Sequence, residues 1–338
     1  MGDGYVRRRA LVGAGAAGLV GLVSYTACGN GTGRDSRKSL RPTEDASFMT
    51  SPTATPTPSP TPSIDTVRLN AALNAALGAR AADVSVAVYD STVDQTFVYH
   101  PELTTVTASI MKVLILVSVA RTRRAAGTSL SEADENLAEN MIRVSDNASA
   151  SALFNRAGRV AGVQKVATSL GMSSTRVKSA WGLTTTTAAD QVTLMRTIAY
   201  GHRLLRADDR ADMLDLMGDV DETQRFGIGT LPAGTTDVEV QVKNGWLPYN
   251  PGRWHDNSVG HVQGAGRDYV AAILSTGNAT DLAGRALVTK AAGVLYASLH
   301  RPSCTGLVGQ AGEDVLGVFG EAGSGGDRLA GDGDLDVA

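Results

Sequence analysis

The alternation of apolar and polar residues predicts strands near both ends of residues 64–300 and helices between them. Short β-branched and aromatic runs at 85–91 and 95–100 are separated by a polar turn, which is typical of a hairpin. Period-two patterns return late in the chain and predict three more strands, at 237–246, 257–263 and 268–276. Apolar residues at helical spacing predict the helices, which cover 66–80, 109–124, 131–142, 147–157, 160–170, 187–201, 206–218 and 281–299.

The order of these elements predicts the fold class. Two strands, a helical middle, three strands and a closing helix favour an α/β (α+β) fold, in which an antiparallel sheet is assembled from both chain ends and a helical lobe is inserted. The helix that begins at Ser109 is apolar on every face for three turns. Such a helix is expected to be fully buried.

Residues 1–28 have the composition of an export signal. An arginine cluster precedes an apolar, Gly-rich and Ala-rich run that ends at Cys28. Arg7 and Arg8 resemble the pair of a twin-arginine signal. Cys28 resembles the acylated cysteine of a bacterial lipobox, although Tyr25 is a poor residue for its position. We expect a protein anchored by lipid to the outer face of the cell membrane, or secreted; conventional signal cleavage and an uncleaved membrane anchor are the alternatives.

Two further segments are too polar to build a core. Residues 29–63 end in a Pro/Thr/Ser-rich stretch, which is typical of an extended linker. Residues 301–338 are Gly-rich and acidic, which predicts a disordered tail. Residues 64–300 remain as one domain of suitable length.

Composition excludes several classes of protein. The 338-residue chain is 43% apolar and has a net charge of −3, so it has no basic excess for binding nucleic acid. Its two cysteines, Cys28 and Cys304, cannot form a four-cysteine zinc site or a disulfide framework. A G-x-G-x-x-G pattern at 13–18 lies within the export segment, without the strand that a dinucleotide site needs. We therefore expect no metal and no organic cofactor.

The first candidate motif is Ser109-Ile-Met-Lys112. A serine three residues before a lysine on a helix places the hydroxyl and the amine on one face. Burial would lower the pKa of the amine, so that it could accept the proton of the hydroxyl. The first turn of a helix also offers backbone N–H groups to a developing anion.

The second candidate motif is Ser145-Asp146-Asn147, which lies between two predicted helices. A short polar turn there can direct a second hydroxyl and a carboxamide toward a site. The alternative is an ordinary helix N-cap, because Ser, Asp and Asn are all favoured at that position.

The third candidate motif is Lys243-Asn244-Gly245-Trp246. The preceding strand alternates valine with polar residues, so Lys243 is expected to face away from the valines. Gly245 would permit close approach of a ligand, and the N–H of Trp246 could donate to an oxyanion. The alternative is an exposed edge strand whose lysine discourages aggregation.

These three motifs, once each and in this order, resemble the signature of the serine penicillin-recognising enzymes, the class A β-lactamases and penicillin-binding proteins. The resemblance implies an antiparallel sheet flanked by helices beside a helical lobe. It implies that Ser109 is the acylated nucleophile, Lys112 the general base and Ser145 the proton relay. The N–H groups of Ser109 and Trp246 would form the oxyanion hole. Lys243 would attract the substrate carboxylate.

The resemblance also implies the residues that bind the substrate. Asn147 would hold its side-chain amide, and the strand residues Asn244, Gly245 and Trp246 would line it. Arg253, near the third motif, could help to bind a carboxylate; the alternative is a solvated turn residue.

The sequence departs from the family pattern in three places. Asn244 replaces the Thr or Ser whose hydroxyl usually binds the substrate carboxylate. The stretch from Ser109 to Ser145 is short, which suggests a trimmed lobe. Class A enzymes use a loop glutamate to activate the deacylating water, yet no glutamate occurs from Asn140 to Asp221. Loss of a positioned base should slow deacylation by about 10² to 10⁴-fold.

The sequence therefore predicts a monomeric serine hydrolase that forms an acyl-enzyme with β-lactams or D-Ala-D-Ala-like cell-wall peptides and deacylates slowly. A D-alanyl carboxypeptidase or esterase is one alternative. A surface module that binds a ligand without turning it over is the other.

Overall fold

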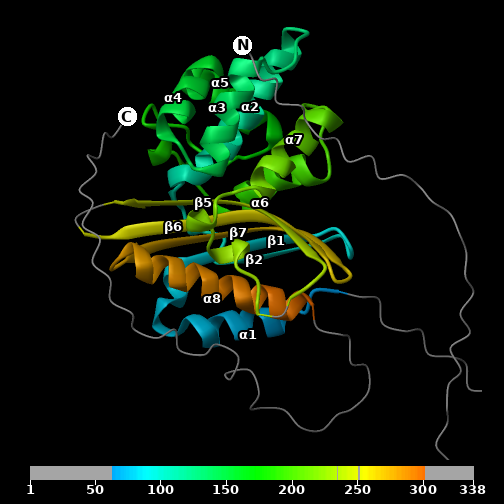
Figure 1. The fold of residues 1–338 in the computed structure, drawn as a ribbon. Helices are drawn as coiled ribbons and strands as arrows, with labels where there is room; N and C mark the ends of the chain where they lie inside the picture. The colour runs from blue at the N-terminus through cyan, green and yellow to red at the C-terminus, as the bar shows by residue number, and fades with distance from the viewer. Residues whose placement is uncertain (1–62, 234, 250–251, 301–338) are drawn as a thin grey trace, which may run out of the picture. The chain divides into compact units, whose positions relative to one another are not determined.

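Five antiparallel strands, drawn from both ends of the domain, form one sheet in the computed structural model (Figure 1). The structure describes residues 63–233, 235–249 and 252–300. The strands lie in the order β2-β1-β7-β6-β5. Their bounds are β1 Val84–Asp90, β2 Gln95–Tyr99, β5 Val238–Pro248, β6 Trp254–Gly264 and β7 Arg267–Asn278.

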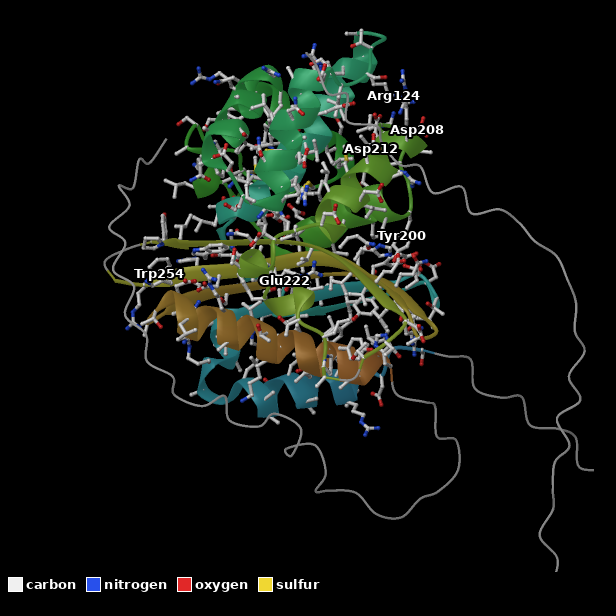
Figure 2. All side chains as sticks on the ribbon, in the orientation of Figure 1. Arg124, Tyr200, Asp208, Asp212, Glu222 and Trp254 are labelled. Carbon is white, nitrogen blue, oxygen red and sulfur yellow. The ribbon has the colours of Figure 1, made fainter. Side chains whose placement is uncertain are left out.

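The eight α-helices of the described residues divide between the two faces of this sheet (Figure 1). Two of them, α1 Thr66–Leu77 and α8 Asp281–Leu299, cover one face. The others build the lobe on the opposite face: α2 Met111–Ala125, α3 Glu132–Arg143, α4 Asn147–Arg156, α5 Arg159–Leu170, α6 Ala188–Ala199 and α7 Ala207–Gly218. Side chains fill the space between lobe and sheet (Figure 2). The predicted α+β architecture is confirmed.

Helix α2 is the most deeply buried element of the lobe. Every residue from Met111 to Ala120 is buried, as its unbroken apolar pattern predicts. A single lysine, Lys112, lies within this run and is 0% exposed. Burying a charged ammonium is costly, so its surroundings must compensate or remove the charge.

A buried carboxylate joins three helices of the lobe. Asp134, near the start of α3, accepts hydrogen bonds from Arg123 of α2 at 2.8 Å and from Arg156 of α4. It also completes a capping box with Ser131. These ion pairs keep the pKa of Asp134 below its usual value despite burial. The ends of α2 and α4 are thereby held beside α3.

The short elements around α2 have no counterpart in the predicted pattern. The helix begins at Met111 rather than Ser109, because residues 108–110 form a 3-10 turn, η2. Just before it, β3 Thr105–Val106 pairs with β4 Thr185–Thr186. A second 3-10 turn, η3 Trp181–Leu183, precedes β4.

The predicted export segment, linker and acidic tail, with Cys28 and Cys304, lie outside the described residues, apart from Ser63 at the linker's end. Within the described part of the chain, no helix is long and apolar enough to cross a membrane.

Candidate active site

The amine of Lys112 lies at the centre of the candidate site. Its Nζ contacts Ser109 Oγ at 2.9 Å, Ser145 Oγ at 2.9 Å and the Ser145 carbonyl at 2.6 Å. It also contacts Asn147 Oδ1 at 2.8 Å. An ammonium has three protons, and a neutral amine has two protons and one lone pair, so either form makes at most three of these four contacts at once. The neutral form is the one that can accept the Ser109 hydroxyl proton.

Lys243 completes the group on the other side of Ser145. Its Nζ donates to Ser145 Oγ at 3.0 Å and to the carbonyl of Asn244 at 2.9 Å. The Ser145 hydroxyl therefore lies between two amines. We call Ser109, Lys112, Ser145, Asn147 and Lys243 the Ser–Lys cluster.

Burial controls the charge of both lysines. It lowers the pKa of Lys112 to about 7, against a smaller opposing effect of the Asp146 carboxylate. It also lowers the pKa of Lys243 well below its usual value, and the positive charge of Lys112 lowers that pKa further. A large share of Lys112 is therefore neutral near pH 7, as a general base requires.

Ser145-Asp146-Asn147 is both a helix cap and part of the cluster. The Asp146 carboxylate accepts the Ser149 N–H at 2.6 Å and so caps α4. Ser145 has a left-handed backbone, with φ of 60°. This turn allows Ser145 and Asn147, which flank the capping residue Asp146, to reach Lys112 Nζ. The two interpretations of the motif are therefore compatible.

Gly245 is the point at which the sheet approaches the nucleophile. A Cβ at this position would lie 2.5 Å from the Ser109 nitrogen and 2.6 Å from that of Ile110. Both contacts are to backbone that cannot move aside. Only glycine therefore allows β5 to lie against η2.

The side chains of Asn244 and Trp246 lie on the opposite face of the sheet from Ser109. Asn244 Nδ2 donates to the carbonyls of Gln224 and Phe226, at 2.9 and 3.0 Å. Trp246 packs against Phe226 and stacks 4.0 Å from the guanidinium of Arg285 on α8. The Asn244 carboxamide therefore does not take the place of the family's hydroxyl beside the nucleophile. Trp246 can contribute its backbone only.

Arg253 lies outside the Ser–Lys cluster. It is exposed directly before β6 and donates to the carbonyl of Gly277 at 3.4 Å. Its neighbour His255 is buried between Thr105 and Thr276, and burial lowers its pKa. Neither side chain contacts the cluster.

The 3-10 turn η3 lies beside the amine of Lys112. Lys112 Nζ lies 5.0 Å from the centre of the Trp181 ring, whose Nε1 donates to Ser151 Oγ at 3.2 Å. The described residues provide no carboxylate hydrogen bond to Ser109 or Lys112. Trp181 was not among the predicted site residues, because an isolated tryptophan has no distinguishing spacing.

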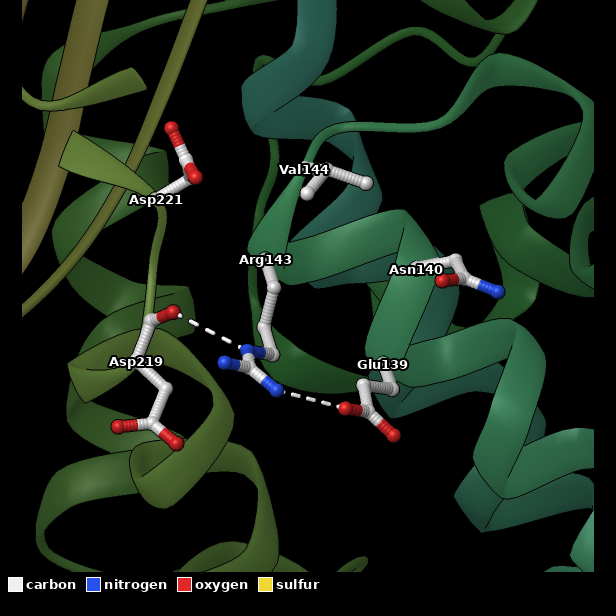
Figure 3. Close-up of a pocket in the computed structure, with 6 residues that line it drawn as sticks. All are labelled: Glu139, Asn140, Arg143, Val144, Asp219 and Asp221. Carbon is white, nitrogen blue, oxygen red and sulfur yellow. Dashed lines mark hydrogen bonds and ion pairs between the residues drawn. The ribbon is translucent and has the colours of Figure 1, made fainter. Parts of the chain in front are cut away.

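A pocket opens where α3 ends, two residues before Ser145. The guanidinium of Arg143 donates to Glu139 at 2.7 Å and to the Asp219 carbonyl at 3.2 Å (Figure 3). Three carboxylates and one guanidinium give it a net negative charge. It is lined by Glu139, Asn140, Arg143, Val144, Asp219 and Asp221.

Solved structures that match this fold include class A β-lactamases and PBP-A. The class A β-lactamase of Bacteroides cellulosilyticus has a TM-score of 0.61 at 19% identity, covering 70% of this chain and 98% of its own. TLA-1 extended-spectrum β-lactamase has a TM-score of 0.62 at 16% identity, covering 70% and 99%. PBP-A has a TM-score of 0.59 at 20% identity, covering 69% and 96%. These likenesses define a class A β-lactamase fold.

Residues 134–299 also match the model of the β-lactamase enzyme family, and this range includes the second and third motifs. No curated protein sequence matches the chain significantly. Together with the fold and the cluster geometry, the match to the family model supports a relationship of the chain to the class A β-lactamase-like family.

Proposed function

We propose that this protein forms an acyl-enzyme at Ser109 with β-lactams or D-Ala-D-Ala-like peptides and releases the acyl group slowly. The observation that carries the proposal is the contact of one buried amine, Lys112 Nζ, with the hydroxyls of both Ser109 and Ser145. PBP-A, a structural relative, has been solved as a variant with glutamate in place of leucine in an acyl-enzyme complex with penicillin G.

Acylation begins with proton transfer from Ser109 Oγ to neutral Lys112 Nζ across 2.9 Å. The oxygen attacks the substrate carbonyl and forms a tetrahedral intermediate. Backbone N–H groups of Ser109 and Trp246 stabilise the oxyanion. Close approach of β5 to η2 at Gly245 supports this pairing of donors.

Breakdown of the intermediate requires a proton on the leaving nitrogen. Lys112 passes its proton to Ser145 Oγ at 2.9 Å, and Ser145 donates its own proton to the nitrogen. Lys243, at 3.0 Å from the same oxygen, orients this hydroxyl and attracts the substrate carboxylate. The C–N bond breaks and an ester to Ser109 remains.

Hydrolysis of that ester requires a base for water. Lys112 is the base that the cluster offers, and it is already engaged by four oxygens. We therefore expect a long-lived acyl-enzyme. Without a loop carboxylate, deacylation should be about 10² to 10⁴-fold slower than with one.

Labelling with a fluorescent penicillin, followed by intact mass measurement, tests the proposal. Wild type should gain the mass of the intact penicillin and lose it slowly, whereas Ser109→Ala should gain none. Transient labelling of wild type would identify a fast hydrolase. Absence of labelling, with reversible binding retained, would instead support a surface module that binds without acylation.

We also propose export and lipid anchoring at Cys28, which places the site outside the cell membrane near cell-wall peptides. The arginine cluster, the apolar run and the polar linker of residues 29–63 support this location.

A further inference from the structure

The turn that presents Ser109 has a strained backbone. Ala108, directly before the nucleophile, has φ of +48°, in the left-handed region that residues with a Cβ avoid. Such a conformation persists only where its surroundings impose it. If Ala108 relaxed to negative φ, the Oγ of Ser109 would rotate away from Lys112 Nζ.

Asn257 of β6 holds the residues just before this turn. Its side chain is 0% exposed, and its Nδ2 donates to the carbonyls of Val106 at 2.9 Å and Thr107 at 3.2 Å. These are the two residues that precede Ala108. A carboxamide nitrogen has the two protons that two adjacent carbonyls require.

The sheet register places Asn257 directly opposite Gly245. This cross-strand pair supports the turn at residues 106–109. Gly245 leaves room for the Ser109 backbone, and Asn257 donates to the carbonyls of Val106 and Thr107. On the other side, the Thr107 N–H donates to the Thr184 carbonyl at 2.7 Å. Asn257 is the side chain that donates to this segment from the sheet.

Stability alone is a poor explanation for an asparagine at this position. Asn257 Oδ1 is buried and has no hydrogen-bond partner among the described residues. An unsatisfied buried acceptor is destabilising relative to an apolar group of similar shape. The free-energy cost of the unpaired Oδ1 therefore offsets part of the stability that the two donated hydrogen bonds provide.

We propose that Asn257 is a positioning residue for acylation, which maintains the strained turn at Ala108 and so keeps Ser109 Oγ against Lys112 Nζ. This inference rests on the proposed function of Ser109. Asn257 does not contact the substrate; it acts through the backbone of residues 106–108.

The first experiment separates acylation from binding in Asn257→Ala. The rate of fluorescent-penicillin acylation should fall by about 10²-fold, the scale expected for misplacement of a reacting group. Non-covalent affinity, measured with and without the substitution in a Ser109→Ala background, should be unchanged. Asn278→Ala is the matched control, because Asn278 is also fully buried and donates two side-chain bonds, to Asp256 and Ser275. It should lower the melting temperature but not the acylation rate.

A second experiment tests the strain directly. Glycine adopts positive φ at little cost, so Ala108→Gly should restore part of the acylation rate that Asn257→Ala removes. If Asn257→Ala alone folds poorly, the double variant with Ala108→Gly still tests the proposal, because relief of strain should restore the fold as well.

The outcomes are distinct. If wild type is not acylated, the proposed function fails. If wild type is acylated but Asn257→Ala reacts as fast as Asn278→Ala, the inference is overturned. Failure of Ala108→Gly to recover any acylation in the double variant would also overturn it.

Discussion

Lys112 combines two properties that conflict in most proteins, full burial and an ionisable amine. Its surroundings resolve the conflict by favouring the neutral form, because burial outweighs the attraction of Asp146. The same group is therefore tolerated in the core of α2 and able to accept a proton from Ser109. The basicity that we propose for this residue is a direct consequence of where the helix is packed.

The pH dependence of acylation follows from this charge state. Only neutral Lys112 can accept the Ser109 proton, and its pKa is lowered to about 7. The acylation rate should therefore rise with pH through about 7 and level off above it, when followed from about pH 5 to pH 9. Lys112→Arg, which stays charged, should be inactive throughout. A rate independent of pH across this range would exclude Lys112 as the base.

A second residue-scale prediction concerns Asp256, which is buried on the α8 side of the sheet. Burial and the neighbouring Asp281 carboxyl raise its pKa. The folded protein thus retains a proton at Asp256 that the unfolded chain loses, so the contribution of this group to stability falls as pH rises from acid toward neutral, by up to about 1.4 kcal/mol per pH unit. Asp256→Asn should flatten this dependence in thermal unfolding.

Asn278→Ala provides the control for that measurement. It removes a 2.8 Å hydrogen bond to the Asp256 carboxyl but no titrating group. The melting temperature should fall at every pH while the pH dependence remains and extends to higher pH, because the Asn278 bond lowers the pKa of Asp256. An identical pH dependence in wild type and Asp256→Asn would contradict a protonated Asp256.

Local spacing was sufficient to predict some site residues but not others. Ser109 and Lys112 share a helical face, so four residues of sequence define their contact. The side chain of Asn244 could have been placed correctly, because it has the same strand parity as Val242. Asn257 had no such signal, because its role depends on register with a strand and a turn elsewhere in the chain.

At the scale of elements, the three-residue turn η3 bears on the slow release that we propose. It lies at 181–183 in the segment between α5 and β4, with the Trp181 ring centre 5.0 Å from Lys112 Nζ. Elements this short have no hydrophobic period, so neither η3 nor the β3–β4 pair could be predicted from the sequence. The longer strands and helices were predicted, because each spans several periods of burial.

Gly182 offers a position at which to supply the absent base. A Cβ there would meet only Leu247 Cδ2 at 3.9 Å and Ala108 Cα at 4.0 Å, both ordinary contacts. Ala108 immediately precedes the nucleophile. Gly182→Glu is therefore expected to accelerate deacylation by about 10² to 10⁴-fold, measured as the lifetime of the penicillin adduct by intact mass.

Gly182→Gln is the matched control, because it has the same shape without a basic group. Its adduct should last as long as that of wild type. Equal adduct lifetimes for Gly182→Glu and Gly182→Gln would show that a carboxylate at this position of η3 does not activate water.

At the scale of the whole molecule, we expect the N-terminal segment to determine where the chemistry occurs. If Cys28 is acylated, Cys28→Ser should move the protein from the membrane fraction to the soluble exported fraction, with penicillin labelling unchanged. Metabolic labelling with a fatty acid should mark wild type only. Equal membrane association of both proteins would favour an uncleaved membrane anchor over lipidation.

The register of the sheet also has a consequence for biosynthesis. Strand β1, made early, pairs along its length with β7, which ends at Asn278. A nascent chain must therefore wait for nearly all of the domain before its first hairpin acquires a neighbour, and meanwhile its apolar faces stay uncovered. A premature stop codon before β7 would leave a fragment with exposed apolar strand faces, which is prone to aggregation, rather than a smaller functional protein.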